Sequence, residues 1–500
     1  MITKIRNNTA RSIIHLHEYQ IQAVDFAKQT FKCGLFLDLG LGKTLISLIA
    51  LEDLYHQDFG HILIIAPKAI AKTTWLSEIQ KWNIEIPCES LICNEKGKSL
   101  SRKKRLEAYR DVVRNPVRTI YLINRELISD LVENLPLNAD GQPIWAFQTI
   151  IVDEFQSFKS STSERFQALK KVSCATQRLI GLTGTPAPQG IEDLWSEIYL
   201  MDYGQRLGST LTAFRKTYMI PDFFHPLTRQ PVAWKAAPGA EDKVYSRVND
   251  IVISMKNKLK LPEMTEIFDY VYLDETEFKN YRKLASSGLL EFARGDAATG
   301  NTPAVLTNRL QQMASGTVYT VDADDKPTGE YAKLHSRKLD MLKYIRDNTD
   351  DNLLVAYYFN SDLSEISAFL DKNKIPYVIY DASKSAEIQK EWDANKIPLL
   401  LIHPASAGFG LNLQYSGRRL IWYTLSFNLE QYTQTIGRIH RQGQTRPVFI
   451  HYLLTAKTID ERVLAALKQK DCSQQAMLDA LDYAKFNLLE TKAAVISSYA

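Results

Sequence analysis

The sequence predicts an α/β protein with two doubly wound parallel-sheet domains, helical insertions and a helical C-terminus. The first observation is a series of short, almost unbroken apolar runs in the first half of the chain, each followed by a polar or glycine-containing turn. Such runs are typical of strands buried on both faces, as in a parallel sheet covered by helices. The second observation is that this alternation restarts at Asn352, which indicates a second sheet.

The first predicted sheet starts with the apolar run Cys33 to Leu39. A glycine turn follows it, and then an amphipathic helix over Leu45 to Leu54. Strand, glycine turn and helix in this order direct a helix N-terminus at the turn. The other predicted strands of this sheet are Ile62 to Ala66, Thr119 to Ile123, Ile150 to Val152 and Arg178 to Leu182.

The second half of the chain repeats the pattern. Between the sheets lie aromatic loops around Met219 to Ala240, helices over Glu275 to Phe292 and Val305 to Ser315, and a polar run, Val321 to Tyr331, which we predict to be a flexible joint. The predicted strands of the second sheet are Asn352 to Phe359, Ile375 to Tyr380, Ile397 to His403, Arg419 to Tyr423 and Pro447 to Leu453. A helix over Thr458 to Lys470 and further helix over Gln474 to Ala500 complete the chain.

These elements predict four parts. The first domain covers residues 1–275 and carries an insertion over about 190–265. A helical connection covers residues 276–332, the second domain covers 333–456, and the C-terminal helices cover 457–500.

Composition excludes several classes of protein. The 61 Lys and Arg residues exceed the 57 Asp and Glu residues by 61 − 57 = 4, so the net charge neither requires nor excludes nucleic acid. The five cysteines lack CxxC pairs, which argues against disulfides and structural zinc. No apolar run approaches the roughly 18 residues that span a bilayer. We therefore expect a cytoplasmic protein with no membrane partner.

The segment Phe36 to Thr44, FLDLGLGKT, contains the parts of a phosphate-binding loop. Gly40 and Gly42 let several backbone N–H groups point at one anion, Lys43 can reach the β- and γ-phosphates of ATP, and the Thr44 hydroxyl can ligate Mg²⁺. A GxGKT string alone also fits an ordinary glycine turn. Its position between an apolar strand and a helix favours nucleotide binding.

Two adjacent carboxylates follow the predicted strand Ile150 to Val152. Open α/β sheets bind ligands at the carboxyl ends of their strands. Asp153 can hold Mg²⁺, partly through water, and Glu154 can deprotonate the attacking water, so the pair favours hydrolysis over binding alone. The alternative is an ordinary Asp-Glu pair in a loop.

Thr183 and Thr185 in LTGTP follow another buried strand and could sense the γ-phosphate, although the string alone is only a turn. Arg438 and Arg441 are three residues apart and share one face if their segment is helical. Such a pair can stabilise the charge that develops during phosphoryl transfer, an effect worth about 10³ to 10⁵ in rate. The alternative is a solvated basic helix.

In order, spacing and several identical strings, these motifs resemble the Swi/Snf-type ATPases of helicase superfamily two, which translocate on double-stranded DNA. The resemblance covers about residues 12 to 470 and implies two RecA-like domains, ATP and Mg²⁺ as cofactors, and DNA as partner, with the helix Thr458 to Lys470 as a brace. The matching strings are GLGKT at 40–44, the segment 64–82 with Trp75, Glu78 and Trp82, the segment 123–127, DEFQ at 153–156, LTGTP at 182–186, GFGLNLQ at 408–414 and QTIGRIHRQGQ at 434–444.

The resemblance also assigns further site residues. Gln20 in LHEYQ matches the glutamine that reads adenine, and Gly410 and Gln434 stand at nucleotide-binding positions. The sequence departs from the family pattern at Gln156, which replaces a histidine, at Pro404, which replaces a threonine that faces DNA, and at Thr424, which replaces an aspartate. The chain is similar to the minimal motors of phages and bacteria, which implies a bacterial or phage-infected cytosol.

The expected mechanism places ATP between the two domains. Lys43, Thr44, Asp153 and Glu154 form one wall and the arginine pair forms the other, so that ATP draws the domains together and hydrolysis releases them. The expected contacts to DNA phosphates, for each of which a solvated surface cation is the alternative, are Lys68, Arg125, Lys159 and Arg309.

Two other functions share these residues. A strand-separating DNA or RNA helicase would use the same ATPase motifs, and only product assays distinguish it. A nucleotide-gated binding module would close on ATP to recruit a protein, although Glu154 and both arginines argue against it. For the segment Gln474 to Ala500, binding of a protein partner and covering of the motor both stay open. The sequence leaves open the biological pathway, the polarity of movement and the oligomeric state.

Overall fold

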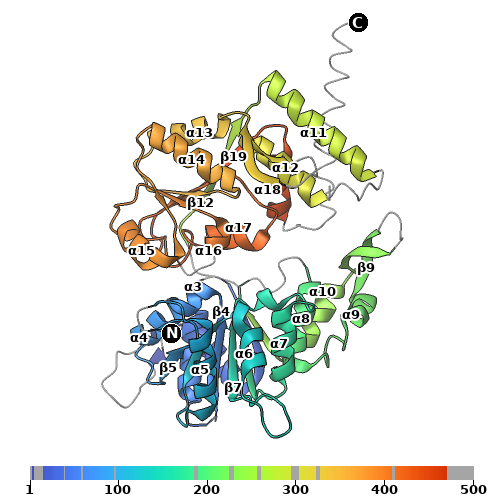
Figure 1. Cartoon of the computed structure of the whole chain (residues 1–500), viewed down its shortest axis with the longest axis vertical. Coiled ribbons are helices and arrows are strands. Elements are labelled where there is room, and N and C mark those ends of the chain that lie inside the picture. The colour runs from blue at the N-terminus through green and yellow to red at the C-terminus, as the bar shows by residue number, and fades with distance from the viewer. Residues whose placement is uncertain are drawn as a thin grey trace. The chain divides into compact units, whose positions relative to one another are not determined.

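The computed structural model describes residues 3–4, 15–38, 40–57, 60–94, 97–184, 190–224, 230–255, 261–293, 303–321, 327–407 and 411–469. The chain divides into two compact units, shown in Figure 1. The first consists of Met1–Ile220 with Trp234–Lys258, and the second of Pro221–Ala233 with Leu259–Ala500.

The first unit is built on a parallel sheet of seven strands. Its central strands are buried along their whole length, because helices cover both faces. In sheet order the strands are β11 (Val252–Met255), β3 (Lys32–Leu37), β8 (Arg178–Thr183), β7 (Phe147–Asp153), β4 (His61–Ala66), β6 (Ile120–Asn124) and β5 (Cys88–Ser90).

The helices of the first unit mostly connect these strands. They are α1 (Glu18–Gln29), α2 (Lys43–Asp53), α3 (Lys68–Lys72), α4 (Thr74–Lys81), α5 (Arg102–Arg114), α6 (Ile128–Asn134), α7 (Glu164–Ser173), α8 (Glu192–Asp202), α9 (Leu211–Tyr218) and α10 (Ala240–Val248), with 3-10 turns η1 (Arg125–Leu127) and η2 (Phe155–Phe158). A short strand pair, β1 (Thr3–Lys4) with β2 (His15–Leu16), also belongs to the first unit, whereas the pair of β9 (Met219–Phe224) with β10 (Pro231–Ala236) has residues in both units.

The second unit contains a parallel sheet of six strands. In sheet order they are β12 (Met264–Val271), β19 (Val448–Thr455), β18 (Arg419–Trp422), β15 (Leu353–Ala356), β17 (Leu399–Ile402) and β16 (Val378–Ile379). Its helices are α11 (Glu275–Ala293), α12 (Pro303–Ser315), α13 (Arg337–Asp347), α14 (Asn360–Lys372), α15 (Ser385–Asp393), α16 (Pro404–Ala407), α17 (Leu429–Ile436) and α18 (Ile459–Gln469), and a 3-10 turn, η4, spans Ala382–Lys384.

Alternate residues of this second sheet serve two hydrophobic cores. Leu354 and Ala356 of β15 belong to a core with residues of α11, α12 and α18. Leu353 and Val355 belong to a core with residues of α13 and α14, which lie beside each other in Figure 1. The period of two residues in a strand explains this division, because successive side chains point to opposite faces.

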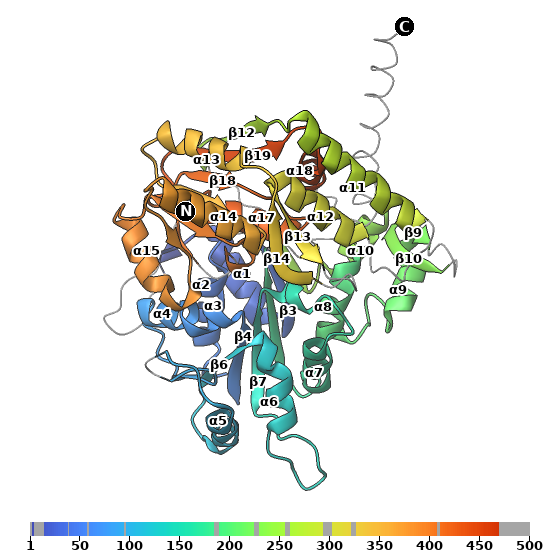
Figure 2. The ribbon, with the colours of Figure 1, turned by 45° about the horizontal axis from the view of Figure 1, so that its top comes forward.

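The predicted fold class is confirmed, since both sheets are parallel and helix-covered. Residues 322–326 of the joint predicted at Val321 to Tyr331 lie outside the described residues. The two ends of this run belong to β13 (Thr317–Val321) and β14 (Pro327–Lys333), which form an antiparallel pair, and β13 contacts α12 and α14, as Figure 2 shows. The Tyr319 and Tyr331 rings lie 6.1 Å apart across the pair and help to hold it.

The boundary predicted at residue 275 also differs from the structure. β12 lies before it, yet pairs with β19 over its whole length from Met264 to Val271. The second sheet therefore includes a strand that the sequence placed in the first domain. In the described part of the chain, no helix is both long enough and apolar enough to cross a membrane.

One buried carboxylate in the second unit leads to a testable pH dependence. Asp362 is 1% exposed at the start of α14 and accepts the backbone N–H groups of Tyr358 (3.3 Å) and Phe359 (2.9 Å). Burial raises its pKa to about 6. In the unfolded chain the pKa of an aspartate is about 3.9, so between about pH 4 and 6 the folded state binds more protons.

The free energy of unfolding therefore loses a contribution of up to about 3 kcal/mol as pH rises from 4 to 6. Asp362→Asn lacks this contribution. The free energy of unfolding is measured in urea at pH 4, 5, 6 and 7 for the wild type, for Asp362→Asn and for a control, Asp350→Asn, at an exposed position. As pH rises, the wild type should lose stability relative to Asp362→Asn. The difference in stability between the wild type and Asp350→Asn should stay constant. A difference that stayed constant with pH would contradict the assignment.

Candidate functional site

The glycine loop of the first unit joins the end of β3 to the start of α2. Gly40 and Gly42 have φ angles of 83° and 78°, in the left-handed region that favours glycine. A Cβ atom on Gly42 would also lie 2.6 Å from Nε2 of Gln20. α2 begins at Lys43, directly after this turn, so its N-terminal N–H groups face the loop and form an anion-binding end.

Lys43 bends back over the loop. Its Nζ donates hydrogen bonds to the carbonyl oxygens of Leu37 (2.7 Å) and Asp38 (3.3 Å). The ammonium group thus lies where the chain leaves β3, and Thr44 follows in the first turn of α2. In these positions the Lys43 amine could bind a phosphate group, and the Thr44 hydroxyl could bind its metal ion.

Gln20 is joined to the same loop. Its side chain is 6% exposed, its Nε2 donates to the carbonyl of Leu41 (3.3 Å), and its Oε1 accepts the N–H of His17 (3.0 Å). α1 therefore contacts the glycine loop through this glutamine, which lies at the entrance to the predicted phosphate site.

Asp153 and Glu154 meet the glycine loop at one edge of the sheet. Asp153 is aligned with Leu182 of β8, and Thr183 of β8 is aligned with Phe36 of β3, so three strand ends lie side by side. Figure 2 shows β3 and β7 within this sheet. The structure thus brings the predicted phosphate, metal and water-activating residues to a common edge.

Neighbouring groups orient the carboxylate of Asp153 and shift its pKa. Oδ2 accepts a 3.0 Å hydrogen bond from Nε1 of Trp75, which is fully buried on α4. Burial, and next the charge of Glu154, raise the pKa of Asp153, whereas the Trp75 hydrogen bond and the Lys43 charge oppose the rise. A bound cation would favour the ionised carboxylate further.

Glu154 has an unusual backbone conformation. Its φ and ψ are 52° and 58°, a left-handed conformation that costs free energy in a residue other than glycine. Gln156, at the position where the family carries histidine, is 1% exposed and donates a 2.6 Å hydrogen bond from Nε2 to Oε2 of Glu154. The glutamine therefore holds the carboxylate that we expect to activate water.

The arginine pair of the second unit is not helical. α17 ends at Ile436, so Arg438 and Arg441 lie in the turns that follow, and the condition for a shared helix face, a helical segment, is not met. Gly437 interrupts the helix and costs it stability there. We call residues 437–446 the arginine turn.

Both arginines nevertheless contact one segment, residues 411–417, which we call the acceptor loop. Nη1 of Arg438, a residue only 7% exposed, donates to the carbonyl of Leu411 (3.3 Å). Nη1 of Arg441 donates to Oδ1 of Asn412 (2.8 Å). Gln434 is buried on α17 and donates to Glu430 (3.1 Å), and Gly410 lies outside the described residues.

Three of the four predicted DNA contacts follow strands of the first sheet. Lys68 is exposed after β4, Arg125 follows β6 and pairs with Glu126 (2.9 Å), and Lys159 follows η2 and pairs with Asp193 (3.5 Å). Arg309 lies on α12 of the second unit. The sequence thus places its cationic candidates mainly at the edge that carries the glycine loop.

Sequence reasoning missed two residues near these positions. Arg165 on α7 is partly buried, and its pKa is lowered by burial and next by the charge of Arg125, the first residue of η1, which α7 contacts. Trp75 was matched to the family pattern without a role, and the structure makes it the hydrogen-bond donor to Asp153. No local pattern signals the influence of Arg125 on Arg165, because it depends on the contact between α7 and η1.

Two other departures from the family pattern lie in ordinary structural positions. Pro404 is the first residue of α16, where its missing N–H is not needed. Thr424 is 1% exposed and shares a 2.7 Å hydrogen bond with Ser315, so it belongs to the interior of the second unit. Thr185 of LTGTP lies outside the described residues.

Comparison with known families places these geometries in context. Residues 19–315 match the SNF2-related domain, and residues 337–443 match the helicase conserved C-terminal domain. The chain belongs to the SNF2-related family. This SNF2-related protein is accordingly a helicase-like ATPase of superfamily two, a family whose members use ATP with Mg²⁺.

Curated relatives of this SNF2-related protein occur in phages and eukaryotes. Protein p41 of Acyrthosiphon pisum secondary endosymbiont phage 1 is 29% identical over 93% of this chain and 98% of its own length. Chromodomain-helicase-DNA-binding protein 1-like of Danio rerio is 24% identical over 91% of this chain and 43% of its own length. The ISWI chromatin-remodeling complex ATPase ISW1 of Saccharomyces cerevisiae is 25% identical over 91% of this chain and 40% of its own length. The chain thus spans less than half of the two eukaryotic relatives.

Proposed function

We propose that this protein is a DNA-stimulated ATPase that moves along duplex DNA. The observation that carries the proposal is the common sheet edge at which Lys43, Asp153 and Glu154 meet, with Lys68 and Arg125 after neighbouring strands of the same sheet. In this proposal one sheet carries both the ATPase site and the cations that contact DNA. A change at the nucleotide can therefore be transmitted through the sheet to the DNA contacts.

In the proposed reaction, Lys43 and the N-terminus of α2 hold the phosphates of ATP. Thr44 and Asp153 would hold Mg²⁺, which would neutralise negative charge on the phosphates. Trp75 keeps one oxygen of Asp153 in place, and Glu154, held by Gln156, accepts the proton of the attacking water. Gln20 reads the adenine next to the glycine loop.

Arg438 and Arg441 complete the reaction in this proposal. ATP draws the arginine turn toward the phosphates, where a guanidinium group stabilises the transition state. Because the turn belongs to the second unit, binding and hydrolysis alternately close and open the two units. DNA held by both units is then moved in steps.

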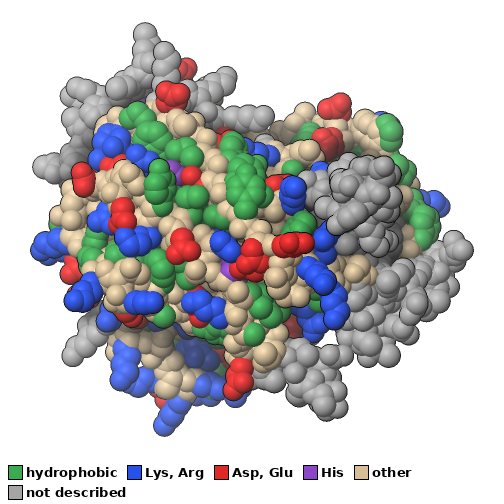
Figure 3. Space-filling model, turned by 90° about the horizontal axis from the view of Figure 1, so that it is seen from above, with side chains coloured by type: hydrophobic (Ala, Val, Ile, Leu, Met, Phe, Trp, Pro, Cys, Tyr) green, Lys and Arg blue, Asp and Glu red, His purple; other side chains and the backbone are tan. Residues whose placement is uncertain are grey.

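The grip on DNA is expected to come from local phosphate contacts. Over the face in Figure 3, Lys and Arg side chains are distributed among Asp, Glu and hydrophobic side chains, in keeping with a net charge of only +4. Contacts from Lys68, Arg125, Lys159, Arg309 and the newly found Arg165 would be independent of base sequence and sensitive to salt. The name of the Danio rerio relative includes DNA binding, which supports the same partner.

Triplex displacement tests the proposal. A duplex that carries a fluorescent third strand is incubated with protein and ATP, beside a forked duplex with one labelled strand. A duplex translocase should release the third strand only with hydrolysable ATP, should leave the fork paired, and should be inactive as Lys43→Ala. Release of the forked strand would instead support a helicase, and release of neither would contradict a motor function.

A further inference from the structure

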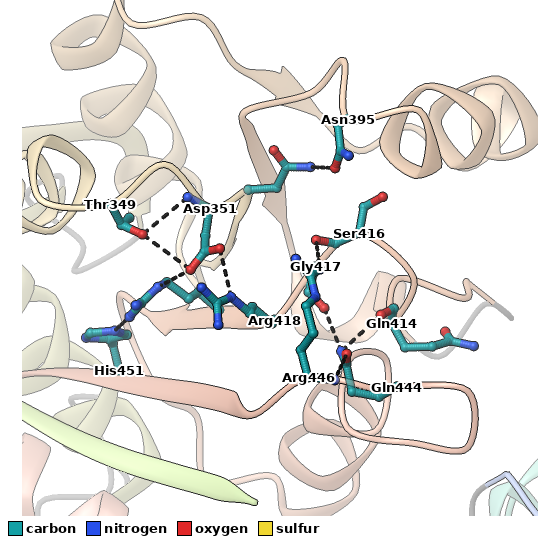
Figure 4. A network of polar contacts seen from close by, with 12 residues as sticks. Thr349, Asp351, Asn395, Gln414, Ser416, Gly417, Arg418, Gln444, Arg446 and His451 are labelled. Atoms are coloured by element: carbon teal, nitrogen blue, oxygen red, sulfur yellow. Dashed lines mark hydrogen bonds and ion pairs between the residues drawn. The ribbon is translucent and has the colours of Figure 1, made fainter. Parts of the chain in front are cut away.

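Gln444 occupies a central position in the arginine turn. It is 6% exposed, and the Nε2 atom of its carboxamide donates to the carbonyl oxygens of Gln414 (2.9 Å), Gly417 (2.9 Å) and Ile439 (3.1 Å). Its Oε1 accepts the backbone N–H groups of the next two residues, at 3.1 and 3.0 Å. Figure 4 shows this carboxamide between the two segments.

The carboxamide joins the acceptor loop to the arginine turn. Gln414 and Gly417 belong to the loop, whereas Ile439 follows Arg438 in the turn. The other end of the same loop provides the oxygen atoms that receive both arginines, and the N–H of Leu413 donates to the carbonyl of Arg438 (3.1 Å). A change in the spacing of loop and turn would therefore move both guanidinium groups.

The acceptor loop itself is fixed from the other side. Nε1 of Trp392 on α15 donates to the carbonyl of Leu413 (3.0 Å), and a Cβ atom on Gly417 would lie 2.6 Å from the Trp392 ring. Just beyond the loop, Arg418 and Arg419 both pair with Asp351, at 2.8 and 2.7 Å, and Figure 4 shows Arg418 beside Asp351. The anchored loop is therefore the fixed reference against which Gln444 places the arginine turn.

We propose that Gln444 is a positioning residue for Arg438 and Arg441. Its carboxamide sets the spacing between the acceptor loop and the arginine turn, and thereby places both guanidinium groups for ATP hydrolysis. The inference rests on the proposed function, which assigns the arginines to that reaction. A misplacement of about 1 Å in a catalytic group can lower a rate by about 10²-fold.

The test is a double-mutant cycle on DNA-stimulated ATPase activity. Gln444→Met keeps the length of the side chain and removes both hydrogen-bonding ends, and Gln442→Met, at an exposed position of the same turn, is the matched control. Gln444→Met should lower kcat roughly 10- to 100-fold with little change in KM for ATP, whereas Gln442→Met should leave both unchanged. In a background that lacks both guanidinium groups, Arg438→Ala with Arg441→Ala, Gln444→Met should have almost no further effect on kcat.

All variants are compared below their melting temperatures, so that a loss of folded protein does not contribute to kcat. If Gln444→Met kept the wild-type kcat, or if its effect multiplied with that of the variant that lacks both arginines, the positioning role would be overturned. If the variant that lacks both arginines kept the wild-type kcat, the assignment of the arginines would fail instead. Should Gln444→Met not fold, Gln444→Asn, which keeps a shorter amide, enters the same cycle and should show a smaller but equally non-additive loss.

Discussion

Replacing Glu154 by glutamine is expected to lower kcat for ATP hydrolysis by roughly 10²- to 10⁴-fold, with little change in ATP affinity. The glutamine has the same shape but cannot accept the proton of the attacking water. Lys43, Thr44 and Asp153, which we assign to phosphate and Mg²⁺, are unchanged, so the nucleotide should still bind. The strained backbone at Glu154 and its hydrogen bond from Gln156 mark this carboxylate as held for a specific task.

Steady-state ATPase assays and titration with a fluorescent ATP analogue measure the two quantities separately. Glu107→Gln, at an exposed position of α5, is the control and should behave as wild type. If Glu154→Gln hydrolysed ATP at the wild-type rate, Glu154 would not be the base. If a hydrolysis-deficient Glu154→Gln protein still supported function in cells, the nucleotide-gated binding module would become the better explanation.

Replacing Arg441 by alanine is expected to lower kcat by about 10³- to 10⁵-fold, the range observed when an arginine finger is removed. The side chain donates to Asn412 in the acceptor loop, which orients the guanidinium group. Arg441→Lys should recover only part of the rate, because an ammonium group cannot form the planar, forked contacts of arginine.

The same ATPase assay with Lys390→Ala, at an exposed position of α15, controls for a loss of surface charge in the second unit. Binding of ADP should be retained in Arg441→Ala, because the arginine stabilises the transition state more than it stabilises the product complex. A kcat within about threefold of wild type would show that Arg441 does not take part in phosphoryl transfer.

The sequence predicted the buried parts of the fold better than the edges. Runs such as Ile62 to Ala66 are apolar throughout because both of their faces are covered, and such runs are easily identified as strands. β12 mixes polar and apolar residues without a regular period, Met-Thr-Glu-Ile-Phe-Asp-Tyr-Val, and is a partly exposed edge strand. β5, with three residues, is too short to stand out from a loop.

In the candidate site, too, some residues can be predicted from the sequence and others cannot. Its catalytic candidates follow strands in short motifs, so sequence alone identifies Lys43, Asp153 and Glu154. The residues that orient them are distant in sequence, as Trp75 is from Asp153, and depend on tertiary packing. The end of α17 before Arg438 also escaped prediction, since a single glycine is tolerated in many helices.

The most direct test of the proposed function is the steady-state ATPase rate without nucleic acid and with single-stranded DNA, duplex DNA or RNA. Each rate is measured beside Lys43→Ala, which lacks the amine that we assign to the phosphates of ATP. We expect duplex DNA to stimulate the wild type most strongly and the control to show no activity. Stimulation by single strands or RNA alone, or by no nucleic acid at all, would contradict a duplex-DNA motor.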